Sequence, residues 1–589
     1  MADRPCRVYA PVGPCEQLLP YLVRRLLENG ANTSFVHALA DRSQSAEELV
    51  NDRVDSAPLP PPPDLFAPFR RNARGCDLYD GETLSMLRHG VEAHFPHEIR
   101  AVPLIGGQEA GGAERPIRAP ATPERLLGRV VEATRVDVAA AVNQAVDAFA
   151  GWDGLGGDGR AEVLERAAGL LEDDPGIFLY LALQEAGKTW GDAIGEWREA
   201  VDFLRYYAAE ARRLFAAAQT LPAVAGESNR LVLRGRGVFA CISPWNFPLS
   251  IFIGQVAAAL AAGNAVVAKP APQTPLMAFV ATRLLHRAGV PVQALHLLPG
   301  DAQLGQSLVK HPGIAGVAFT GSHASARAIA ATLAQGQGPL VPLIAETGGV
   351  NAMIVDSSAL PEQVAADVVA SAFLSAGQRC SALRVLFVQT DVATPVLDLV
   401  IGMVARLRLG DPADPATDLG PLIDAAARRR LEEYEAVLAV RGRLLFKGEA
   451  PAKGWFFAPR IYEVDWPDLP EREAFGPILH VLRYGHGELD RVLGWLCHNG
   501  HGLTLGVHSR IDSTVERVVA EARVGNIYVN RGMTGAMVGC QPFGGMGLSG
   551  TGPKAGGPFT LIRYATEIVV TVNVAAAGGD LSLLCGEGR

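Results

Sequence analysis

The sequence predicts an α/β protein built on a parallel sheet. From residue 238 onwards, runs rich in β-branched and aromatic residues alternate with helical stretches, which is the pattern of consecutive βαβ units. Several of these runs are followed at once by polar residues, where such a sheet usually binds its ligands. Of the 589 residues, 49% are hydrophobic and 20% are charged, which is typical of a globular chain with more than one domain.

The elements can be assigned in order along the chain. Three helices, around 136–150, 160–174 and 192–215, are expected before the alternating region. Within that region, Gly or Gly-Asn ends several helices and so marks where the next strand begins. The expected strands are 237–243, 265–270, 294–300, 313–322 and 340–349, and the expected helices are 249–264, 276–289, 302–312 and 325–336. A second α/β block should follow residue 350, with strands at 384–389 and 503–509.

The N-terminal region has a different composition. Residues 15–36 predict an amphipathic helix that stops at Asn29–Gly30, followed by a short extended piece. The stacked prolines of 57–64 fit neither a helix nor an interior strand, so we expect a stiff linker there. Residues 65–115 are mixed in composition and predict no particular element.

Charge and cysteine content exclude several classes of protein. The net charge is −9 and no Lys/Arg-rich run stands out, which argues against a nucleic-acid partner. Eight cysteines without a CxxC pair are too sparse for a disulfide scaffold or a zinc site, so a reducing cytoplasm is expected. The first residues lack the apolar core of a secretory signal. The uncharged stretch 238–268 is interrupted by prolines and asparagines, so we expect no membrane span.

Three motifs suggest sites but are better explained otherwise. "EAGKT" (185–189) ends like a phosphate-binding P-loop, yet Ala182 stands where its first glycine should be and a helix surrounds it. His94 and His97 have a spacing that metal ligands use but lack a third partner. The glycines of 543–557 are not followed by a periodic helix, so we expect a loop of tight turns rather than a phosphate site.

Polar residues at strand ends define a stronger candidate site. Asn246, Lys269, Ser322 and Glu346 each lie where a predicted strand finishes, so they can converge on one crevice. A cysteine, Cys380, lies in "FLSAGQRCSALR" (373–384). A buried cysteine usually only fills space. A catalytic thiol would need an oxyanion donor and a base for water, which an Asn and a Glu can supply.

Taken together, these motifs resemble the aldehyde dehydrogenase superfamily over roughly residues 119–570. The matching pieces are "PWNFP" (244–248), "KPAPQTP" (269–275), "FTGS" (319–322), "ETGG" (346–349), "GQRCSA" (377–382), "EAFGP" (473–477) and "PFGGMGLSGTG" (542–552). The resemblance implies an aldehyde dehydrogenase fold, with a dinucleotide-binding domain, an α/β catalytic domain and a small β oligomerisation flap. It implies that Cys380 is the nucleophile, that Asn246 holds the oxyanion, and that Glu346 activates water.

The resemblance also implies a nicotinamide cofactor. Lys269 and Glu473 would bind its riboses, Phe475 would lie beside the nicotinamide, and Ser322 would meet the pyrophosphate. Family members that prefer NAD often carry a Glu three residues after the Lys, where this chain has Pro272, so NAD is expected and NADP stays open. The full set of expected cofactor residues is Ile242, Pro244, Trp245, Lys269, Phe319, Gly321, Ser322, Thr347, Gly348, Glu473 and Phe475.

The loop "MTGAMVGCQPFGG" (533–545) resembles the aldehyde-anchor loop of the glutamate-semialdehyde (1-pyrroline-5-carboxylate) dehydrogenase branch. That resemblance implies binding of the substrate carboxylate by the backbone at Gly535 and Ala536 and by Ser381. It also implies flanking of the aliphatic chain by Phe247 and Phe543 and pairing of the substrate ammonium with Glu199. Without the loop, Glu199 would be an ordinary solvated carboxylate.

The N-terminus resembles the last barrel helix of the proline dehydrogenase half of the bifunctional proline utilization A enzymes. Tyr21, Arg24 and Arg25 match residues that clasp proline's carboxylate there, and residues 573–584 resemble the C-terminus of those enzymes. A single helix cannot supply an eight-unit barrel, so we expect no FAD binding and no proline oxidation by this chain alone. The sequence leaves open whether the chain docks to a separate proline dehydrogenase. It also leaves open two other functions, namely a dehydrogenase for a different aldehyde and a non-catalytic subunit. A transcriptional role would need a DNA-binding module that the sequence lacks.

Five segments are expected from these resemblances, together with a homodimer or higher homo-oligomer. They are a barrel remnant (1–40), a linker and arm (41–118), the NAD-binding domain (119–345, with 220–236 in an oligomerisation hairpin), the catalytic domain (346–530), and the anchor loop, oligomerisation strand and tail (531–589).

Overall fold

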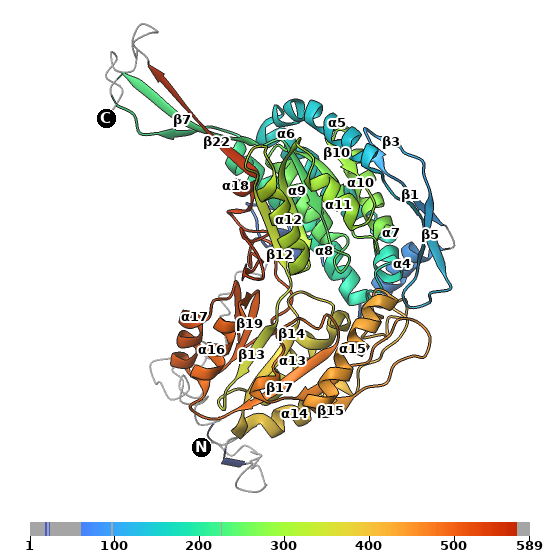
Figure 1. The fold of residues 1–589 in the computed structure, drawn as a ribbon, viewed down its shortest axis with the longest axis vertical. Helices are drawn as coiled ribbons and strands as arrows, with labels where there is room; N and C mark the ends of the chain where they lie inside the picture. The colour runs from blue at the N-terminus through green and yellow to red at the C-terminus, as the bar shows by residue number, and fades with distance from the viewer. Residues whose placement is uncertain (1–17, 20–22, 24–59, 96–97, 225, 574–589) are drawn as a thin grey trace, which may run out of the picture. The chain divides into compact units, whose positions relative to one another are not determined.

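The computed structural model describes residues 18–19, 23, 60–95, 98–224 and 226–573. The chain divides into two units, Met1–Pro61 and Pro62–Arg589, and the sheets and cores lie in the second (Figure 1). The predicted N-terminal helix lies almost wholly outside the described residues, as do residues 57–59 of the linker.

The first large sheet has seven strands in the order β12-β11-β8-β9-β10-β2-β3. The five strands from β12 to β10 are paired in parallel, and only the β10–β2 and β2–β3 pairings, at one edge, are antiparallel. Strand β8 lies between β9 and β11, so the strand order reverses there, and ligands bind at such a point beyond the carboxyl ends. The strands are β2 (Leu104–Ile105), β3 (Gln108–Glu109), β8 (Val238–Ile242), β9 (Ala265–Lys269), β10 (Leu295–Leu297), β11 (Ile314–Gly321) and β12 (Leu343–Thr347).

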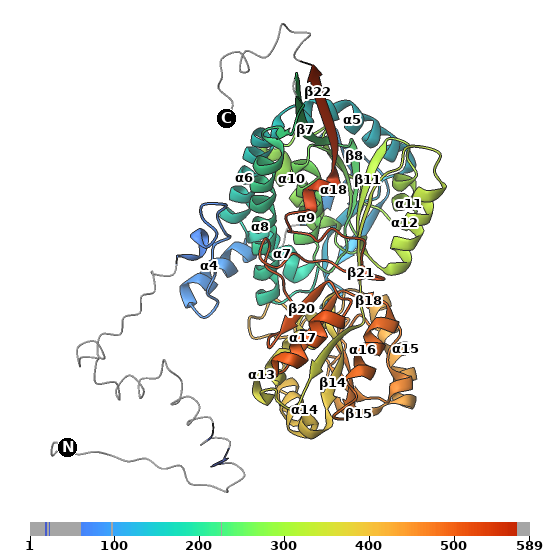
Figure 2. The same ribbon diagram turned by 90° about the vertical axis from the view of Figure 1, so that its left-hand side faces the viewer.

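Helices cover both faces of this sheet (Figure 2). One layer holds α6 (Gly156–Asp173), α8 (Trp190–Phe215), α9 (Ser250–Ala261) and α10 (Pro275–Ala288); the other holds α5 (Arg135–Asp153), α11 (Ala302–Val309) and α12 (His323–Gln335). Because both faces are buried, the parallel strands read as continuous apolar runs rather than alternating ones, as in the all-buried "AVVAK" of β9.

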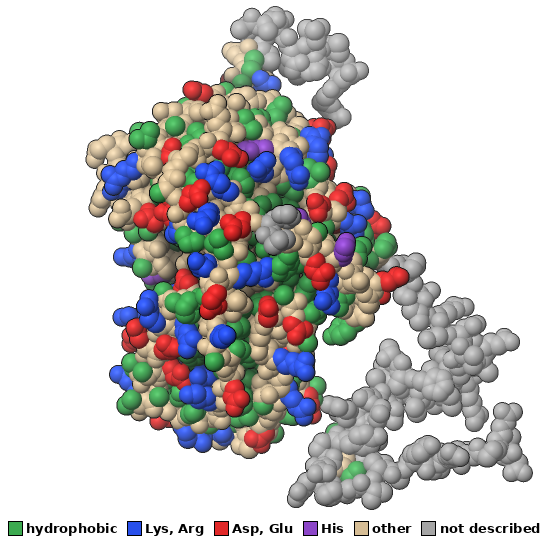
Figure 3. Space-filling model, turned by 90° about the vertical axis from the view of Figure 1, so that its right-hand side faces the viewer, with side chains coloured by type: hydrophobic (Ala, Val, Ile, Leu, Met, Phe, Trp, Pro, Cys, Tyr) green, Lys and Arg blue, Asp and Glu red, His purple; other side chains and the backbone are tan. Residues whose placement is uncertain are grey.

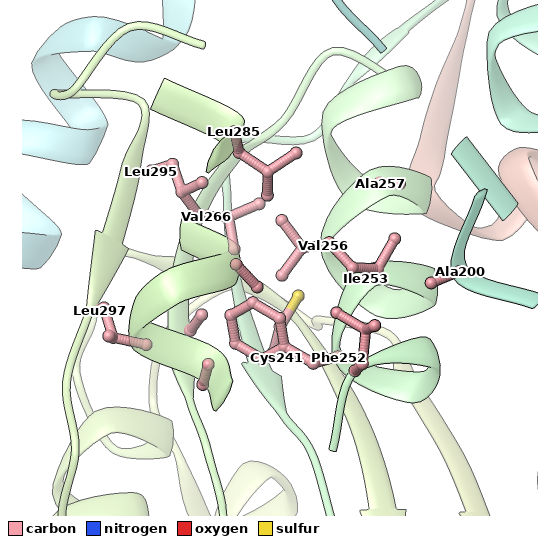
Figure 4. Packing of buried hydrophobic residues seen from close by; sticks show 14 of the residues in the cluster. Ala200, Cys241, Phe252, Ile253, Val256, Ala257, Val266, Leu285, Leu295 and Leu297 are labelled. Carbon is pink, nitrogen blue, oxygen red and sulfur yellow. The ribbon is translucent and has the colours of Figure 1, made fainter. Parts of the chain in front are cut away.

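The core between sheet and helices is formed by small and branched side chains. Cys241 of β8 is fully buried against Phe252, Ile253 and Val256 of α9 (Figure 4), and burial raises its pKa far above the usual value. Each such fully buried aliphatic or aromatic side chain stabilises the fold by about 1.5–3 kcal/mol relative to exposure. Cys241 is therefore a packing residue, which is the ordinary role of a buried cysteine.

The second large sheet has the order β15-β16-β17-β14-β13-β19-β20 and is parallel except at β15. Its strands are β13 (Asn351–Val355), β14 (Leu383–Gln389), β15 (Arg443–Lys447), β16 (Arg460–Glu463), β17 (Ile478–Tyr484), β19 (Thr504–His508) and β20 (Asn526–Val529). Its helices are α13 (Pro361–Phe373), α14 (Thr390–Val404), α15 (Ala425–Arg441), α16 (Leu489–Asn499) and α17 (Asp512–Glu521). The mixed α/β fold with parallel sheets confirms the predicted fold class.

Smaller sheets complete the second unit. Strands β22 (Ala565–Asn573), β7 (Glu227–Gly235) and β6 (Gln219–Leu221) form an antiparallel sheet from the two segments expected to build the flap. Strands β1 (Ile99–Ala101), β5 (Leu126–Val131) and β4 (Glu114–Arg118) form another, and β18 (His501–Gly502) pairs with β21 (Met546–Gly547).

Two stretches escaped the sequence analysis. Helix α7 (Gly176–Gln184) is buried all round, so its "GIFLYLALQ" has no amphipathic period to detect. Residues 65–115, for which the sequence predicted no element, contain α4 (Gly81–Glu92) and the short strands β1, β2 and β3. The short 3-10 helix η1 (Pro62–Asp64) lies just before them. Short strands of two or three residues leave too little pattern to read.

Acidic and basic side chains are interspersed on the face drawn in Figure 3, which therefore presents no broad surface of one sign. Among the helices that the structure describes, none has the length and apolar character needed to cross a membrane.

Candidate active site

Cys380 lies in a strained loop at the amino end of β14. The preceding residues Ser375, Ala376 and Gly377, in the 3-10 helix η2 (Leu374–Gly377), all have positive φ. Non-glycine residues held in that region cost of order 1 kcal/mol or more each, so the surroundings must hold the loop in place. At Gly377 a side chain would overlap the carbonyl oxygen of Gly476, so only glycine fits.

Two side chains hold this loop from different elements. Asp192 of α8 accepts hydrogen bonds from Ser375 Oγ at 2.9 Å and from Arg379 Nη2 at 2.5 Å. Asn351 of β13 donates through Nδ2 to the Cys380 carbonyl at 2.6 Å. We define residues 374–382 as the nucleophile loop. This loop is thus hydrogen-bonded both to α8, which packs on the first large sheet, and to β13 of the second large sheet.

The thiol itself is half-buried and free. Burial raises the pKa of Cys380 to about 12, and the carboxylates of Glu473 and Glu346 add to the rise. The thiol is therefore protonated at neutral pH in this arrangement, and a nucleophilic thiolate needs a base or a change in its surroundings to form.

Asn246 contacts the nucleophile loop. Asn246 follows β8, at the carboxyl edge of the first sheet, and its Nδ2 donates to the backbone carbonyl of Gln378 at 3.1 Å. Gln378 precedes Cys380 by two residues. The carboxyl edge of the first sheet therefore faces the amino edge of the second, and Asn246 contacts the loop that carries the sulfur.

Glu346 lies within electrostatic reach of the thiol, since its charge influences the pKa of Cys380. Its Oε2 accepts the Gly545 N–H at 2.8 Å, and its buried Oε1 has no hydrogen-bond partner among the described residues. Burial raises the pKa of Glu346 to about 8, although the Gly545 N–H and the Lys554 ammonium both favour the carboxylate. A carboxyl group with this pKa and one free oxygen is suited to accept a proton from water.

The Gly-rich segment 543–557 covers this carboxyl group. Side chains at Gly544 and Gly550 would lie 2.6 Å and 2.9 Å from its two oxygens, so the loop can approach only because these residues are glycines. Phe543 pairs with Ala555 in an isolated bridge, and Gly547, Gly552 and Gly556 have positive φ. The segment is a loop of turns, as expected, but its contact with Glu346 is a role that the sequence analysis missed.

The expected nicotinamide end of the cofactor site also lies beside the thiol. Glu473 influences the pKa of Cys380 more than any other charged group, and a side chain at Gly348 would overlap its carboxylate. Phe475 packs edge-on against Trp245, with ring centroids 5.5 Å apart. The "EAFGP" segment thus meets the "PWNFP" segment, as a shared cofactor site requires.

The expected adenosine end lies along the carboxyl edge of the first sheet. Lys269 ends β9, is buried, and its Nζ donates to the Pro270 carbonyl at 3.0 Å. Burial lowers its pKa to about 8, while Asp301 and Glu132 act in the opposite direction. Ser322 caps α12 by accepting the Ser325 N–H at 3.2 Å.

The remaining expected cofactor residues lie along the same edge. Ile242 ends β8, and Pro244 follows it; Phe319 and Gly321 belong to β11, and Thr347 ends β12, where its Oγ1 donates to the Leu548 carbonyl at 2.6 Å.

Expected substrate residues are partly assembled. The Phe247 ring lies 3.7 Å from Lys188 Nζ, and Lys188 forms a buried 2.9 Å ion pair with Glu196. Burial raises the pKa of Glu199 to about 7, while the nearby cations Lys188 and Arg379 act against the rise. Ser381 is buried beside the thiol. For Gly535 (φ +84°) and Ala536, no hydrogen bond that ties them to the nucleophile loop is found in the part of the chain that the structure describes.

Other polar residues at the site were not singled out from the sequence: Lys188, Asp192, Glu196, Asn351, Arg384 and Lys554. The P-loop-like motif is not a phosphate site, since Glu185 caps α10 through the Leu276 and Met277 N–H groups. His97 lies outside the described residues, and within those described no His, Cys, Asp or Glu cluster suits a metal ion.

Comparison with known proteins identifies the family. Residues 108–569 match the model of the aldehyde dehydrogenase family, and residues 1–38 match that of proline dehydrogenase. The chain belongs to the aldehyde dehydrogenase family. The resemblance inferred from the motifs, including the short proline dehydrogenase segment, is thereby confirmed, and the chain is an oxidoreductase of this family.

Curated relatives fall into two groups. The bifunctional protein PutA of Klebsiella aerogenes is 46% identical over 592 residues, which is 96% of this chain and 44% of that protein. The 1-pyrroline-5-carboxylate dehydrogenase of Geobacillus thermodenitrificans is 38% identical over 485 residues, or 80% of this chain and 93% of that protein. This chain therefore spans less than half the length of the curated PutA relatives that it matches.

Solved structures agree. A crystal structure of Bradyrhizobium japonicum proline utilization A matches with a TM-score of 0.87 and 51% identity, covering 97% of this chain and 56% of that one. The 1-pyrroline-5-carboxylate dehydrogenase from Thermus, solved with bound NAD, matches with a TM-score of 0.82 and 31% identity, covering 85% of this chain and 99% of that one.

Proposed function

We propose that this chain oxidises L-glutamate γ-semialdehyde, which forms when 1-pyrroline-5-carboxylate opens, to L-glutamate with NAD as the oxidant. The reaction is the second step of proline catabolism. The observations that support the proposal are the hydrogen bond of Asn246 to the nucleophile loop and the electrostatic influence of Glu346 on Cys380. The similarity to 1-pyrroline-5-carboxylate dehydrogenases over most of their length supports the choice of substrate.

In the proposed reaction, Cys380 is the nucleophile, Asn246 stabilises the oxyanion and Glu346 activates water. The Cys380 sulfur, once its proton has left to solvent, bonds to the aldehyde carbon and gives a thiohemiacetal. The Asn246 amide and the Cys380 N–H would stabilise the oxyanion, and one such donor contributes about 10²–10³ in rate. Loss of hydride from that carbon leaves a thioester on Cys380. Glu346 would then take a proton from the water that cleaves the thioester, releasing glutamate and the free thiol.

The residues present fit a dinucleotide. Lys269 Nζ is buried with a single carbonyl acceptor, which leaves N–H groups free for a ribose hydroxyl. Ser322 opens α12, a helix of 13 residues whose N-terminus lies at the carboxyl edge of β11 and suits a pyrophosphate. Glu473 lies beside the thiol and suits the nicotinamide ribose. When bound there, NAD would accept the hydride. Because residue 272 is a proline, no carboxylate at this position would repel the 2′-phosphate of NADP, so NADP is tested alongside NAD.

Substrate selectivity is assigned to the anchor loop and its surroundings. The backbone at Gly535 and Ala536, together with Ser381, would bind the carboxylate of the semialdehyde. Phe247 and Phe543 would flank its chain, and Glu199 would pair with its ammonium group. The cations Lys188 and Arg379 lie beside Phe247, where each is paired with a carboxylate, Glu196 and Asp192 respectively.

We also propose that the chain assembles as a homodimer or higher oligomer through the β22-β7-β6 sheet. Ile568, Val569 and Val572 of β22 are exposed apolar residues on this sheet. Light scattering of the wild type and of a variant with these three residues changed to Ser would test it, and an unchanged mass would contradict it. Docking of a separate proline dehydrogenase would appear as a larger mass after mixing the two proteins.

The deciding experiment measures formation of reduced cofactor with glutamate semialdehyde. Wild-type protein should reduce NAD, with NADP measured in parallel, and the Cys380→Ala variant should not. Faster turnover of simple aldehydes than of the semialdehyde would favour another substrate, and no activity on any aldehyde would favour a non-catalytic partner. Flavin absorbance or proline oxidation by the purified chain would contradict the expectation that it lacks that activity.

A further inference from the structure

Arg384 is a fully buried arginine at the start of β14, four residues after the nucleophile. Its side chain is 1% exposed. The backbone carbonyl of Arg384 accepts a hydrogen bond from His480 Nδ1 at 2.9 Å, and Tyr434 Oη donates to His480 Nε2 at 2.8 Å. Burial lowers the pKa of His480 to about 4, so the imidazole is neutral and this anchor does not change with pH near neutrality.

The guanidinium of Arg384 joins two parts of the candidate site. Its Nη2 donates both to the Arg379 carbonyl, in the nucleophile loop, at 3.1 Å and to Glu473 Oε1 at 2.9 Å. Its Nη1 donates to the Gly476 carbonyl at 3.0 Å. One planar group therefore spans the nucleophile loop and the "EAFGP" segment.

The carboxylate of Glu473 depends on this arginine. Burial raises the pKa of Glu473, and Arg384 and the Gly349 N–H act against that rise. On its other side the carboxylate packs against Gly348, where a side chain would overlap it. Because Glu473 Oε1 accepts an Arg384 N–H, movement of Glu473 toward a ligand changes the hydrogen bonding of Arg384, whose Nε has no partner among the described residues.

We propose that Arg384 is a positioning residue that couples occupancy of the cofactor site at Glu473 to the reactivity of Cys380. The inference rests on the proposed function only in assigning Glu473 to a nicotinamide ribose. A ribose hydroxyl bound by Glu473 competes with Arg384 for that carboxylate. When Glu473 turns toward the ribose, the guanidinium loses that acceptor and shifts toward the Arg379 carbonyl, next to the sulfur, which changes the position of the loop.

A purely structural role for Arg384 is the alternative, and Arg460 provides a matched control. Arg460 is also buried, donates to Glu435 Oε1 at 2.6 Å and to the Ala458 carbonyl at 2.9 Å, and stacks on Phe457. Like Arg384, Arg460 belongs to the second large sheet and donates hydrogen bonds to a carboxylate and to a backbone carbonyl. No hydrogen bond of Arg460 among those described reaches the nucleophile loop. Loss of packing should therefore affect both arginines alike, whereas loss of coupling should affect Arg384 alone.

The test is the rate of Cys380 alkylation by iodoacetamide, followed by peptide mass spectrometry, with and without saturating NAD. In the wild type and in Arg460→Lys, NAD should change the rate by about fivefold or more, the lower end of typical site–site coupling. In Arg384→Lys the ratio should fall below about twofold while NAD still raises the melting temperature, because an ammonium cannot reproduce the fork that holds three acceptors.

Two results would overturn the proposal. One is a wild-type alkylation rate of Cys380 that is the same with and without NAD. The other is a ratio of these two rates in Arg384→Lys that equals the wild-type ratio. If Arg384→Lys does not fold, a double variant that combines Arg384→Met with Glu473→Gln removes both charges together. In this double variant NAD should also leave the alkylation rate of Cys380 unchanged. A change as large as that of the wild type would refute the coupling. No aldehyde is present in these assays. Failure of the wild type to oxidise glutamate semialdehyde would therefore refute the proposed function separately.

Discussion

Replacing Glu346 by Gln should remove the pH dependence of thioester hydrolysis and most of the turnover. Burial raises the pKa of Glu346 to about 8. Only the carboxylate can accept a proton from water, so at pH 7 about one tenth of the sites would be competent for thioester hydrolysis. Turnover limited by this step should rise nearly tenfold per unit from pH 5 to pH 7 and level off above pH 8, whereas Glu346→Gln should be slower by about 10²–10⁴.

A pre-steady-state assay separates the two chemical steps. Formation of one equivalent of NADH reports attack by Cys380 and hydride loss, and the slower steady phase reports hydrolysis. Glu346→Gln should keep the first phase and lose the second. Lys554→Met should move the inflection to higher pH because the ammonium of Lys554 favours the carboxylate, and Lys453→Met, an exposed lysine elsewhere, should not. A steady rate independent of pH from 6 to 9 in the wild type would refute the assignment of Glu346 as the base.

Three further outcomes follow from the site. Cys380→Ala should lose all turnover and bind NAD normally, whereas Cys497→Ala, at an exposed thiol, should match the wild type; turnover by Cys380→Ala would exclude a thioester route. Asn246→Ala should lower kcat by about 10²–10³ as an oxyanion donor is lost, and an effect on KM alone would contradict that role. The affinity for NAD should fall as pH rises through about 8, where buried Lys269 loses its proton; isothermal titration across pH 7 to 9 checks this, and Lys269→Met should remove the dependence.

Much of the fold could be predicted from local patterns. The nine expected elements between 237 and 349 all appear, because each strand there is a short buried run and each helix ends at a glycine or at a polar turn. Helix α7 was missed since it is buried on every side, and the short strands before residue 118 were missed since they owe their conformation to neighbours in the sheet.

The candidate site could be predicted only as a set of residue types. Asn246, Glu346 and Cys380 stood out because their motifs resemble those of a known family, and strand-end reasoning placed the first two at one edge. The contacts of Arg384 with Glu473 and Arg379, and of Asp192 with Arg379, had no local signal, because they join segments that are far apart in sequence.

The sequence by itself determined the parallel α/β architecture, the family and the identity of the candidate reactive groups, because these follow from hydrophobic periodicity and short ordered motifs. Only the tertiary structure decided that the carboxyl edge of one sheet faces the amino edge of the other across Cys380. It also decided that Glu346 lies under a glycine loop and that one buried arginine serves both the nucleophile loop and Glu473. Burial and charge neighbours, which set the pKa values of Cys380, Glu346 and Lys269, arise only when distant segments pack together.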